Sequence, residues 1–334
     1  MDKEWMLMEG LEDLIEKNYD IKVYKSEKMH KVLKLHTSDG VKAFKKLYSS
    51  YREYGFILEV MDHARENGFP NIPRVSPTKD GKMGIEVRKG VYMIMEWINT
   101  RLAQYDIETD LDLMAQALAR LHNASEGYEP SLQVDPRVMW GKWLDLSNIR
   151  YREFEKMKQV AENKKYLTDF DHLFLTHIDY FYDLGKQAVK RMEKCGYEKI
   201  SLQNQKKKTF AHLDAADHNI LITNEKKVYM IDFDNCILDM TLHDLTSLLI
   251  KSVRYGNWDM KRAKLLFHAY HKTRSVLEEE IALMKAFWEF PQDLWLLAHR
   301  YYYENRNWKQ QKFDYSLKRI VDDIESREKF IKEF

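Results

Sequence analysis

FAHLDAADHNILIT occupies residues 210–223, and VYMIDFD follows at residues 228–234. Apolar residues frame the polar ones, so the segment predicts a strand, a loop, and then two strands of a hairpin. Three polar residues lie in the predicted loop with the spacing H-x-D-x-x-x-x-N: His212, Asp214 and Asn219. A loop would present all three side chains on one short length of backbone.

These residues, together with Asp232 at the end of the last strand, match the set that phosphoryl transfer requires. Asp214 is expected to receive or orient the acceptor hydroxyl, while Asn219 and Asp232 are expected to hold Mg²⁺ against the phosphates. The hairpin would bring Asp232 back beside Asn219, so that both could share an ion that prefers oxygen ligands. His212 is expected to support the loop by packing and hydrogen bonding. Asp and Asn are common in loops, but the second Asp in register with apolar strands favours the functional interpretation.

The composition bounds the class of protein. At 334 residues the chain exceeds one typical core, so two lobes are expected. Lys and Arg number 54 against 53 Asp and Glu, so no global basic field is present and neither nucleic acid nor membrane is an expected partner. The two cysteines, Cys195 and Cys236, fit a reducing compartment. No signal peptide and no long apolar span is visible, which predicts synthesis and folding in the cytoplasm.

The first part of the chain predicts a small antiparallel sheet with one helix packed on it, and the part after Ile98 predicts mostly helices. An amphipathic helix is expected over residues 4–17. The short segments that follow alternate between apolar and polar residues and predict strands, and a longer segment with helical periodicity predicts a further helix. The predicted fold is therefore α+β and bilobal, like that of protein kinases. Its N-terminal lobe, residues 1–98, would bind nucleotide, and its helical lobe, residues 99–334, would carry the catalytic and acceptor-binding residues.

A bilobal kinase-like layout also requires ATP-binding residues in the first lobe. Lys45 lies on the predicted third strand, where a lysine would hold the α- and β-phosphates, although an ordinary surface lysine would look the same. A helix glutamate would pair with it, either Glu59, which is favoured, or Glu53. The carbonyl of Glu96 and the amide of Ile98 lie where an adenine would be read, in residue types that also suit a plain core strand.

The turn predicted between the first two strands, residues 26–30, contains no glycine. Backbone amides without glycine approach a phosphate less closely than a glycine-rich loop allows. This feature weakens the case for ATP turnover without weakening the case for the fold.

The chain resembles the aminoglycoside phosphotransferase and choline kinase superfamily. The resemblance rests on the H-x-D-x-x-x-x-N loop, on Ile231-Asp232-Phe233-Asp234, and on the apolar helix opened by Asp244. Within that superfamily the chain is similar to the CotS-type spore coat proteins of endospore-forming bacteria, and to their CotI-like members in particular. The residues behind this narrower resemblance are MWGKW at 139–143, FWEFPQDLW at 287–295 and RYYY at 300–303.

The resemblance implies synthesis in the mother cell, location in the spore coat, other coat proteins as partners, and a small-molecule or polysaccharide acceptor. No obvious acidic cluster appears in residues 280–334, which lean basic instead through Arg300, Arg306, Lys309, Lys312, Lys318 and Arg319. This argues against a polycationic aminoglycoside and suits a neutral or anionic acceptor such as a glycan. Two interpretations remain open: an Mg-ATP phosphotransferase acting on a hydroxyl, and a structural coat component that keeps a kinase fold without useful turnover. Protein kinase activity is disfavoured because no activation segment follows Asp232.

Overall fold

The structure is a computed structural model that describes residues 10–254, 258–304 and 308–334. The chain divides into two compact units, each built from two chain segments. The first unit comprises Met1–Val138 and Lys208–Leu238, and the second comprises Met139–Lys207 and Asp239–Phe334. The predicted lobe boundary at residue 98 follows the change from strand to helix and stays a prediction.

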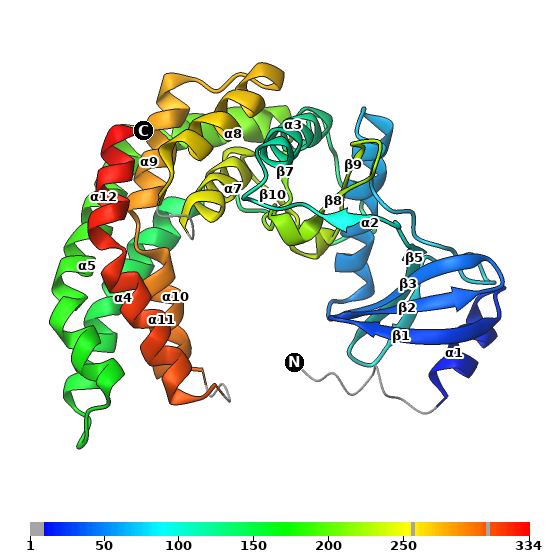
Figure 1. Cartoon of the computed structure of the whole chain (residues 1–334), viewed down its shortest axis with the longest axis horizontal. Coiled ribbons are helices and arrows are strands. Elements are labelled where there is room, and N and C mark those ends of the chain that lie inside the picture. Colours follow the sequence, from blue (N-terminus) through cyan, green and yellow to red (C-terminus); the bar gives the residue numbers. More distant parts are fainter. Residues whose placement is uncertain (1–9, 255–257, 305–307) are drawn as a thin grey trace. The chain divides into compact units, whose positions relative to one another are not determined.

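A five-stranded antiparallel sheet forms the first part of the first unit, in the order β1-β2-β3-β5-β4 (Figure 1). Gly40 begins the third strand with φ 79°, a left-handed conformation that glycine adopts without steric cost, and so closes the hairpin between the second and third strands. The sheet confirms the predicted small antiparallel sheet. Its strands are β1 (Val23–Met29), β2 (Val32–Thr37), β3 (Gly40–Leu47), β4 (Ile85–Val87) and β5 (Gly90–Glu96).

Two helices accompany this sheet. Helix α1 (Leu11–Asn18) shares one buried apolar cluster with strands β1, β2, β3 and β5. The predicted helix over residues 4–17 therefore begins in residues that lie outside the described part of the chain. Helix α2 (Tyr51–Glu66) starts with a capping box, in which Ser50 and Glu53 satisfy each other's backbone amides.

The rest of the first unit positions two loops. Helix α3 (Glu108–Ala124) is the last helix of this unit before the chain enters the second unit. The chain returns at β7 (Phe210–Ala211), which pairs with β10 (Ile237–Leu238). The strands β8 (Ile220–Ile222) and β9 (Val228–Met230) lie between β7 and β10 in the chain and form a three-stranded sheet with β6 (Arg101–Leu102). The predicted catalytic loop thus connects β7 to β8, and the segment that carries Asp232 connects β9 to β10.

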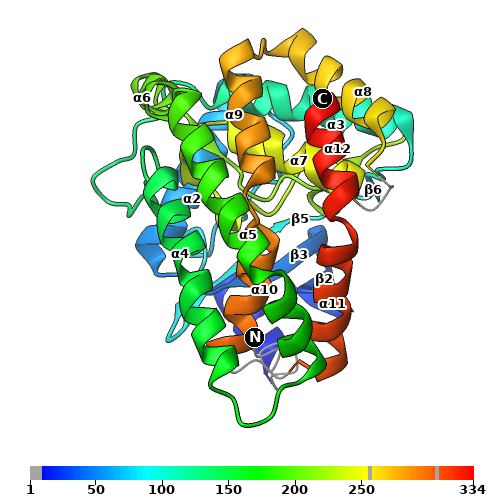
Figure 2. The same ribbon diagram turned by 90° about the vertical axis from the view of Figure 1, so that its left-hand side faces the viewer.

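Helices are the regular elements of the second unit in its described residues, as the sequence predicts for most of this part of the chain. The long helices α4 and α5 pack side by side, and Gly185 of α5 permits their close approach, because an added Cβ would lie 2.8 Å from the Tyr151 Cβ (Figure 2). None of the described helices is long and apolar enough to cross a membrane. The helices are α4 (Trp143–Glu162), α5 (Asp169–Lys194), α6 (Tyr197–Lys207), α7 (Leu242–Arg254), α8 (Met260–Thr273), α9 (Glu278–Glu289), α10 (Gln292–Tyr302), α11 (Gln310–Asp322) and α12 (Ile324–Glu333).

Candidate active site

His212 joins the loop between β7 and β8 to the segment that carries Asp232. The amide of Asp214 donates to His212 Nδ1 at 3.3 Å, so Nε2 carries the proton and donates to the Ile231 carbonyl at 3.0 Å. The ring is fully buried and packs against Phe233, with 4.6 Å between ring centroids. Both ring nitrogens are therefore used to fix one loop against the other.

Asp214 and Asn219 are held together at opposite ends of this loop. Asn219 Nδ2 donates to the Asp214 carbonyl at 2.9 Å and to its carboxylate Oδ2 at 3.2 Å, which leaves Asn219 Oδ1 as the acceptor end of the amide. The Asp214 side chain is 31% exposed, so the carboxylate is accessible while its backbone is fixed. His218 Nε2 lies 3.6 Å from Asp214 Oδ2.

Lys45 of β3 is buried between two carboxylates. Its Nζ lies 2.6 Å from Asp232 Oδ1 and 2.6 Å from Asp234 Oδ2. Burial acts to lower the Lys45 pKa, but Asp234 and Asp232 outweigh that effect and raise the pKa, so the amine stays a cation. Burial acts to raise the Asp232 pKa, but Lys45 outweighs it and the net shift is downward. Burial and the Asp232 charge raise the pKa of Asp234.

The backbone is left-handed at two non-glycine positions of the site. Leu213 has φ 63° and Asp232 has φ 67°, a region that residues with a Cβ adopt only at an energetic cost. Such conformations persist where surrounding contacts fix them, and they concentrate at functional sites. At Asp232 this conformation turns the chain from β9 into a short 3-10 turn over Phe233–Asn235.

The oxygen donors of this site suit Mg²⁺. The described residues contain no cluster of three or more His, Cys, Asp or Glu that would enclose a metal by itself. Mg²⁺ is usually bound by one or two carboxylates and completes its octahedron with water and phosphate oxygens. The Asp232 and Asp234 carboxylates and the Asn219 amide oxygen are donors of that hard type, so the residues fit the ion.

The predicted pairing of Lys45 with a helix glutamate is wrong for this structure. The Glu59 carboxylate accepts from Tyr128 Oη at 3.0 Å and from the Ser131 amide at 3.0 Å, which ties α2 to residues 128–131. The Glu53 carboxylate closes the capping box and accepts from the Ser50 amide at 2.8 Å. Glu53 thus satisfies a local backbone amide and Glu59 a distant one. Lys45 is paired with Asp232 and Asp234 instead.

The end of β5 carries the two residues expected to read adenine. Glu96 is exposed, and its carboxylate and amide bond the backbone of Arg74, at 3.0 and 2.9 Å. Ile98 is half-buried, and its amide forms no hydrogen bond within the part of the chain that the structure describes. A donor at this position would be available to a ligand.

The turn between β1 and β2 differs from the predicted one. Strand pairing continues through residues 26–29 up to the pair Met29 and Val32, so the turn consists of His30 and Lys31 alone. The ladder of backbone hydrogen bonds overrides the polar composition of residues 26–28. His30 adopts φ 53°, so a non-glycine residue occupies the left-handed position of the tip.

Two contributors to the site were not predicted from the sequence. Asp234 binds Lys45, and its signal was its place two residues after Asp232 in an Asp-x-Asp pattern. The Tyr105 hydroxyl accepts from the Asp217 amide at 3.1 Å and braces the loop, although no local pattern around Tyr105 indicates this.

The comparison with protein families assigns the chain. The model of the family described as spore coat putative kinase YutH matches residues 12–334. The chain belongs to the spore coat YutH kinase family. Spore coat protein S of Bacillus subtilis (strain 168) is 25% identical over 305 residues, which cover 90% of this chain and 86% of that protein. The match confirms the predicted resemblance to spore coat proteins with a kinase fold, and the family matched is YutH.

Solved structures place the YutH family chain in the aminoglycoside phosphotransferase and choline kinase fold. An aminoglycoside phosphotransferase from Alicyclobacillus acidocaldarius superposes with a TM-score of 0.82 at 21% identity, covering 96% of this chain and 94% of that one. Spectinomycin phosphotransferase, crystallised with ADP and spectinomycin, superposes with a TM-score of 0.66 at 15% identity, covering 96% and 97% of the two chains. The predicted kinase-like α+β fold is therefore confirmed.

Proposed function

We propose that this protein is a spore-coat-associated phosphotransferase that moves the γ-phosphoryl group of Mg-ATP to a hydroxyl of a sugar, a polysaccharide or a small alcohol. The observation that carries the proposal is the contact between Lys45 and Asp232, which are 187 residues apart in the chain. The fold brings a phosphate-binding cation and a metal-binding carboxylate together, next to the loop that holds Asp214.

Each residue would have one task in the reaction. Asp214 would orient the acceptor hydroxyl and take its proton as the oxygen forms a bond to the γ-phosphorus and the bond to ADP breaks. Asn219 and Asp232 would hold Mg²⁺, which supplies positive charge to the phosphate oxygens. Lys45 would turn from the aspartates to the α- and β-phosphates. His212 would keep the loop in place through its two hydrogen bonds.

The nucleotide would lie against the end of β5. The Glu96 carbonyl and the Ile98 amide would bond the adenine edge, and the ADP complex of spectinomycin phosphotransferase supports nucleotide binding by this fold. Residues 1–98 would form the nucleotide-binding lobe and residues 99–334 the catalytic and acceptor-binding lobe. The protein would be synthesised in the mother cell and assembled into the spore coat with other coat proteins. The family and its relative spore coat protein S support the location in the coat.

A second candidate function is a structural coat component with a kinase fold and little turnover. The glycine-free tip of the β1–β2 hairpin favours it, because backbone amides there would approach phosphates less closely. Both candidates agree with the spore coat assignment, so only turnover separates them.

Phosphoryl transfer by the full chain tests the proposal. We expect ADP formation from Mg-ATP that depends on a hydroxyl-bearing acceptor, screened among sugars, coat polysaccharide and small alcohols. Asp214→Ala should lower that rate by roughly 10²–10⁴-fold, the usual contribution of a positioned base. Asp62→Ala, which removes a carboxylate that is 60% exposed on α2, should leave it unchanged. Transfer that survives Asp214→Ala would contradict the assignment of the base, and no acceptor-dependent transfer at all would favour the structural component.

A further inference from the structure

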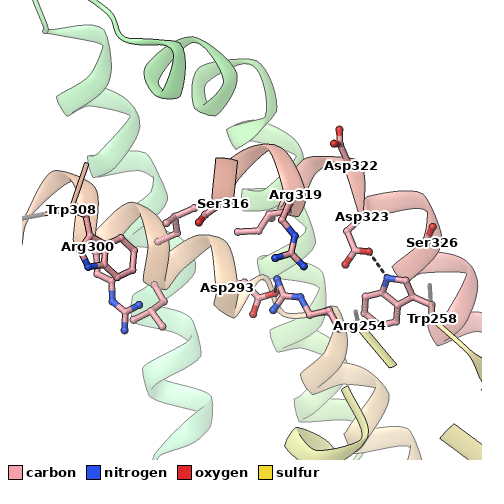
Figure 3. Close-up of a pocket in the computed structure, with 13 residues that line it drawn as sticks. Arg254, Trp258, Asp293, Arg300, Trp308, Ser316, Arg319, Asp322, Asp323 and Ser326 are labelled. Carbon is pink, nitrogen blue, oxygen red and sulfur yellow. Dashed lines mark hydrogen bonds and ion pairs between the residues drawn. The ribbon is translucent and has the colours of Figure 1, made fainter. Parts of the chain in front are cut away.

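A cavity of about 560 Å³ lies within the helical unit, lined by residues of α7, α10, α11 and α12 and by Trp258 and Trp308. Its volume falls in the range of small-molecule sites, roughly 300–1,000 Å³. Figure 3 shows Trp308 and Trp258 toward opposite ends, with the guanidinium groups of Arg319 and Arg254 between them. All of these residues belong to the second unit, whereas Lys45 belongs to the first.

The residues of α10 and α11 that line the cavity share one face of each helix, because they are three or four positions apart. Asp293, Leu297 and Arg300 follow one another at intervals of three and four residues and share one face of α10. Ser316 and Arg319 stand three apart on α11 in the same way. Two helix faces therefore contribute cations, a hydroxyl and apolar contact area to a single space.

The carboxylates of the lining already have donors. Asp293 pairs with Arg254 at 2.7 Å, and Asp322 pairs with Lys318 at 3.1 Å. Asp323 accepts a hydrogen bond from Trp258 Nε1, and burial raises its pKa, which favours the neutral form. Each of these carboxylates is thus bonded to a neighbouring side chain.

Arg300 is the exception among the charged groups of the cavity. Its guanidinium lies 5.6 Å from the centroid of the Trp308 ring, and it forms no ion pair with any residue that the structure describes. Its buried Nε has no hydrogen-bond partner in the same part of the chain. A buried N–H group without an acceptor is rare in proteins, and guanidinium donors match carboxylate and phosphate oxygens in geometry.

We propose that this cavity binds a short acidic saccharide, with the carboxylate or phosphate group of the sugar on Arg300. A compact polyanion would meet the Asp293 and Asp322 charges as well as the arginines. A saccharide separates its acidic group from its neutral hydroxyls, so that Ser316 and Asp322 can bond the hydroxyls while Leu297 contacts the sugar ring. The inference concerns binding alone and goes beyond the proposed phosphoryl transfer.

Calorimetric titration of the full chain, without nucleotide, tests the proposal. The probes are cellobiouronate, which carries one carboxylate, cellobiose 6-phosphate, which carries one phosphate, neutral cellobiose, and inorganic phosphate. We expect saturable binding of one or both acidic disaccharides, with the stronger of the two identifying the acidic group, and no binding of cellobiose. Saturable binding of neither acidic disaccharide, or equal binding of cellobiose, overturns the proposal. Inorganic phosphate that competes as well as the sugars also overturns it, because the cavity would then be a plain anion site.

Variants place the binding in the cavity. Arg300→Ala should weaken it roughly tenfold or more, and Arg300→Lys should retain part of it, since a lysine keeps the charge and loses the planar fork. The matched control is Arg152→Ala, which removes an exposed arginine of α4 in the same unit and should change the affinity less than about twofold. Equal weakening by both alanine variants would overturn the proposal. If Arg300→Ala does not fold, the comparison of Arg300→Lys with Arg152→Ala decides in the same way.

Discussion

Lys45 and the two aspartates around it form the most consequential contact at the scale of single residues. A buried cation between two carboxylates is stable only while all three charges stay together, because each is costly to bury alone. The proposed Mg²⁺ ion would bind the same carboxylates. Lys45 and Mg²⁺ should therefore compete for Asp232 and Asp234 until a nucleotide offers Lys45 its phosphates.

Replacing Lys45 by Met tests this competition. We expect the free energy of unfolding to fall by roughly 1–3 kcal/mol without metal, because two partly buried carboxylates lose their counter-ion. We also expect Mg²⁺ alone to raise the melting midpoint of Lys45→Met more than that of the wild type, since the carboxylates are then vacant. Differential scanning fluorimetry across a Mg²⁺ series measures both effects.

Lys46→Met serves as the matched control for that experiment. Lys46 is the next residue of β3, and its Nζ lies over the Tyr48 and Tyr92 rings instead of in the site. Its response to Mg²⁺ should equal that of the wild type. If Mg²⁺ stabilises both variants equally, Lys45 does not compete with the ion.

The sequence predicts which side chains of the site lie together where those residues are close to one another in the chain. The loop from His212 to Asn219 and the return to Asp232 could be predicted, because fourteen or fewer residues connect each pair of neighbours in the motif. The partner of Glu59 could not, since Tyr128 and Ser131 lie 69 and 72 residues away. Nothing in the local pattern of α2 says which distant amide will reach its glutamate.

At the scale of elements, the β1–β2 hairpin shows how a strand can override its own composition. Residues 26–28 are polar and resemble a turn, yet each pairs with a residue of β2. The pairing leaves a two-residue tip at His30 and Lys31, and the favoured two-residue turns need left-handed residues. His30 meets that requirement at φ 53°, at a steric cost that glycine would not incur.

His30→Gly should therefore stabilise the hairpin modestly, by up to about 1 kcal/mol, with the gain limited by the extra freedom of glycine in the unfolded chain. Lys31→Gly is the paired control, because Lys31 is not among the residues with positive φ and should only lose stability. Urea unfolding of the two variants measures the difference. A stability loss in His30→Gly equal to that in Lys31→Gly would show that the left-handed conformation of His30 carries no strain.

At the scale of the whole molecule, the pH dependence of stability should expose one buried acid in the helical unit. Asp239 is fully buried and accepts a hydrogen bond from Trp143 Nε1, and burial raises its pKa to about 7. The folded pKa lies above the unfolded value, so its stabilising contribution is complete below the unfolded pKa and is lost as pH rises through 7. Burial lowers the pKa of the neighbouring His243 to about 3, and its contribution is lost in the opposite direction, as pH falls below the unfolded value.

Asp239→Asn separates these two effects, because His243 is present in both proteins. The wild type should lose roughly 2–4 kcal/mol of stability relative to Asp239→Asn between about pH 5 and about pH 8. Chemical denaturation of both proteins at each pH gives the difference. A difference that is independent of pH would show that Asp239 titrates at its ordinary value.

The division of the chain was the least predictable feature at this scale. Sequence patterns follow the change from strand to helix near Ile98, whereas the compact first unit also includes residues 99–138 and 208–238. Pairing of β6 with β8 and of β7 with β10 draws these segments in. Such contacts between distant segments leave no periodic signal in the sequence.

The melting midpoint of the full chain, measured with and without millimolar Mg-ATP, shows whether Lys45, Asn219 and Asp232 form a nucleotide site. A ligand that binds only the folded form raises the midpoint by mass action. We predict a metal-dependent rise in the wild type and in Asp62→Ala, and its loss in Asp232→Ala. The absence of a shift in the wild type, or a shift that persists in Asp232→Ala, would contradict a nucleotide site built on Lys45, Asn219 and Asp232.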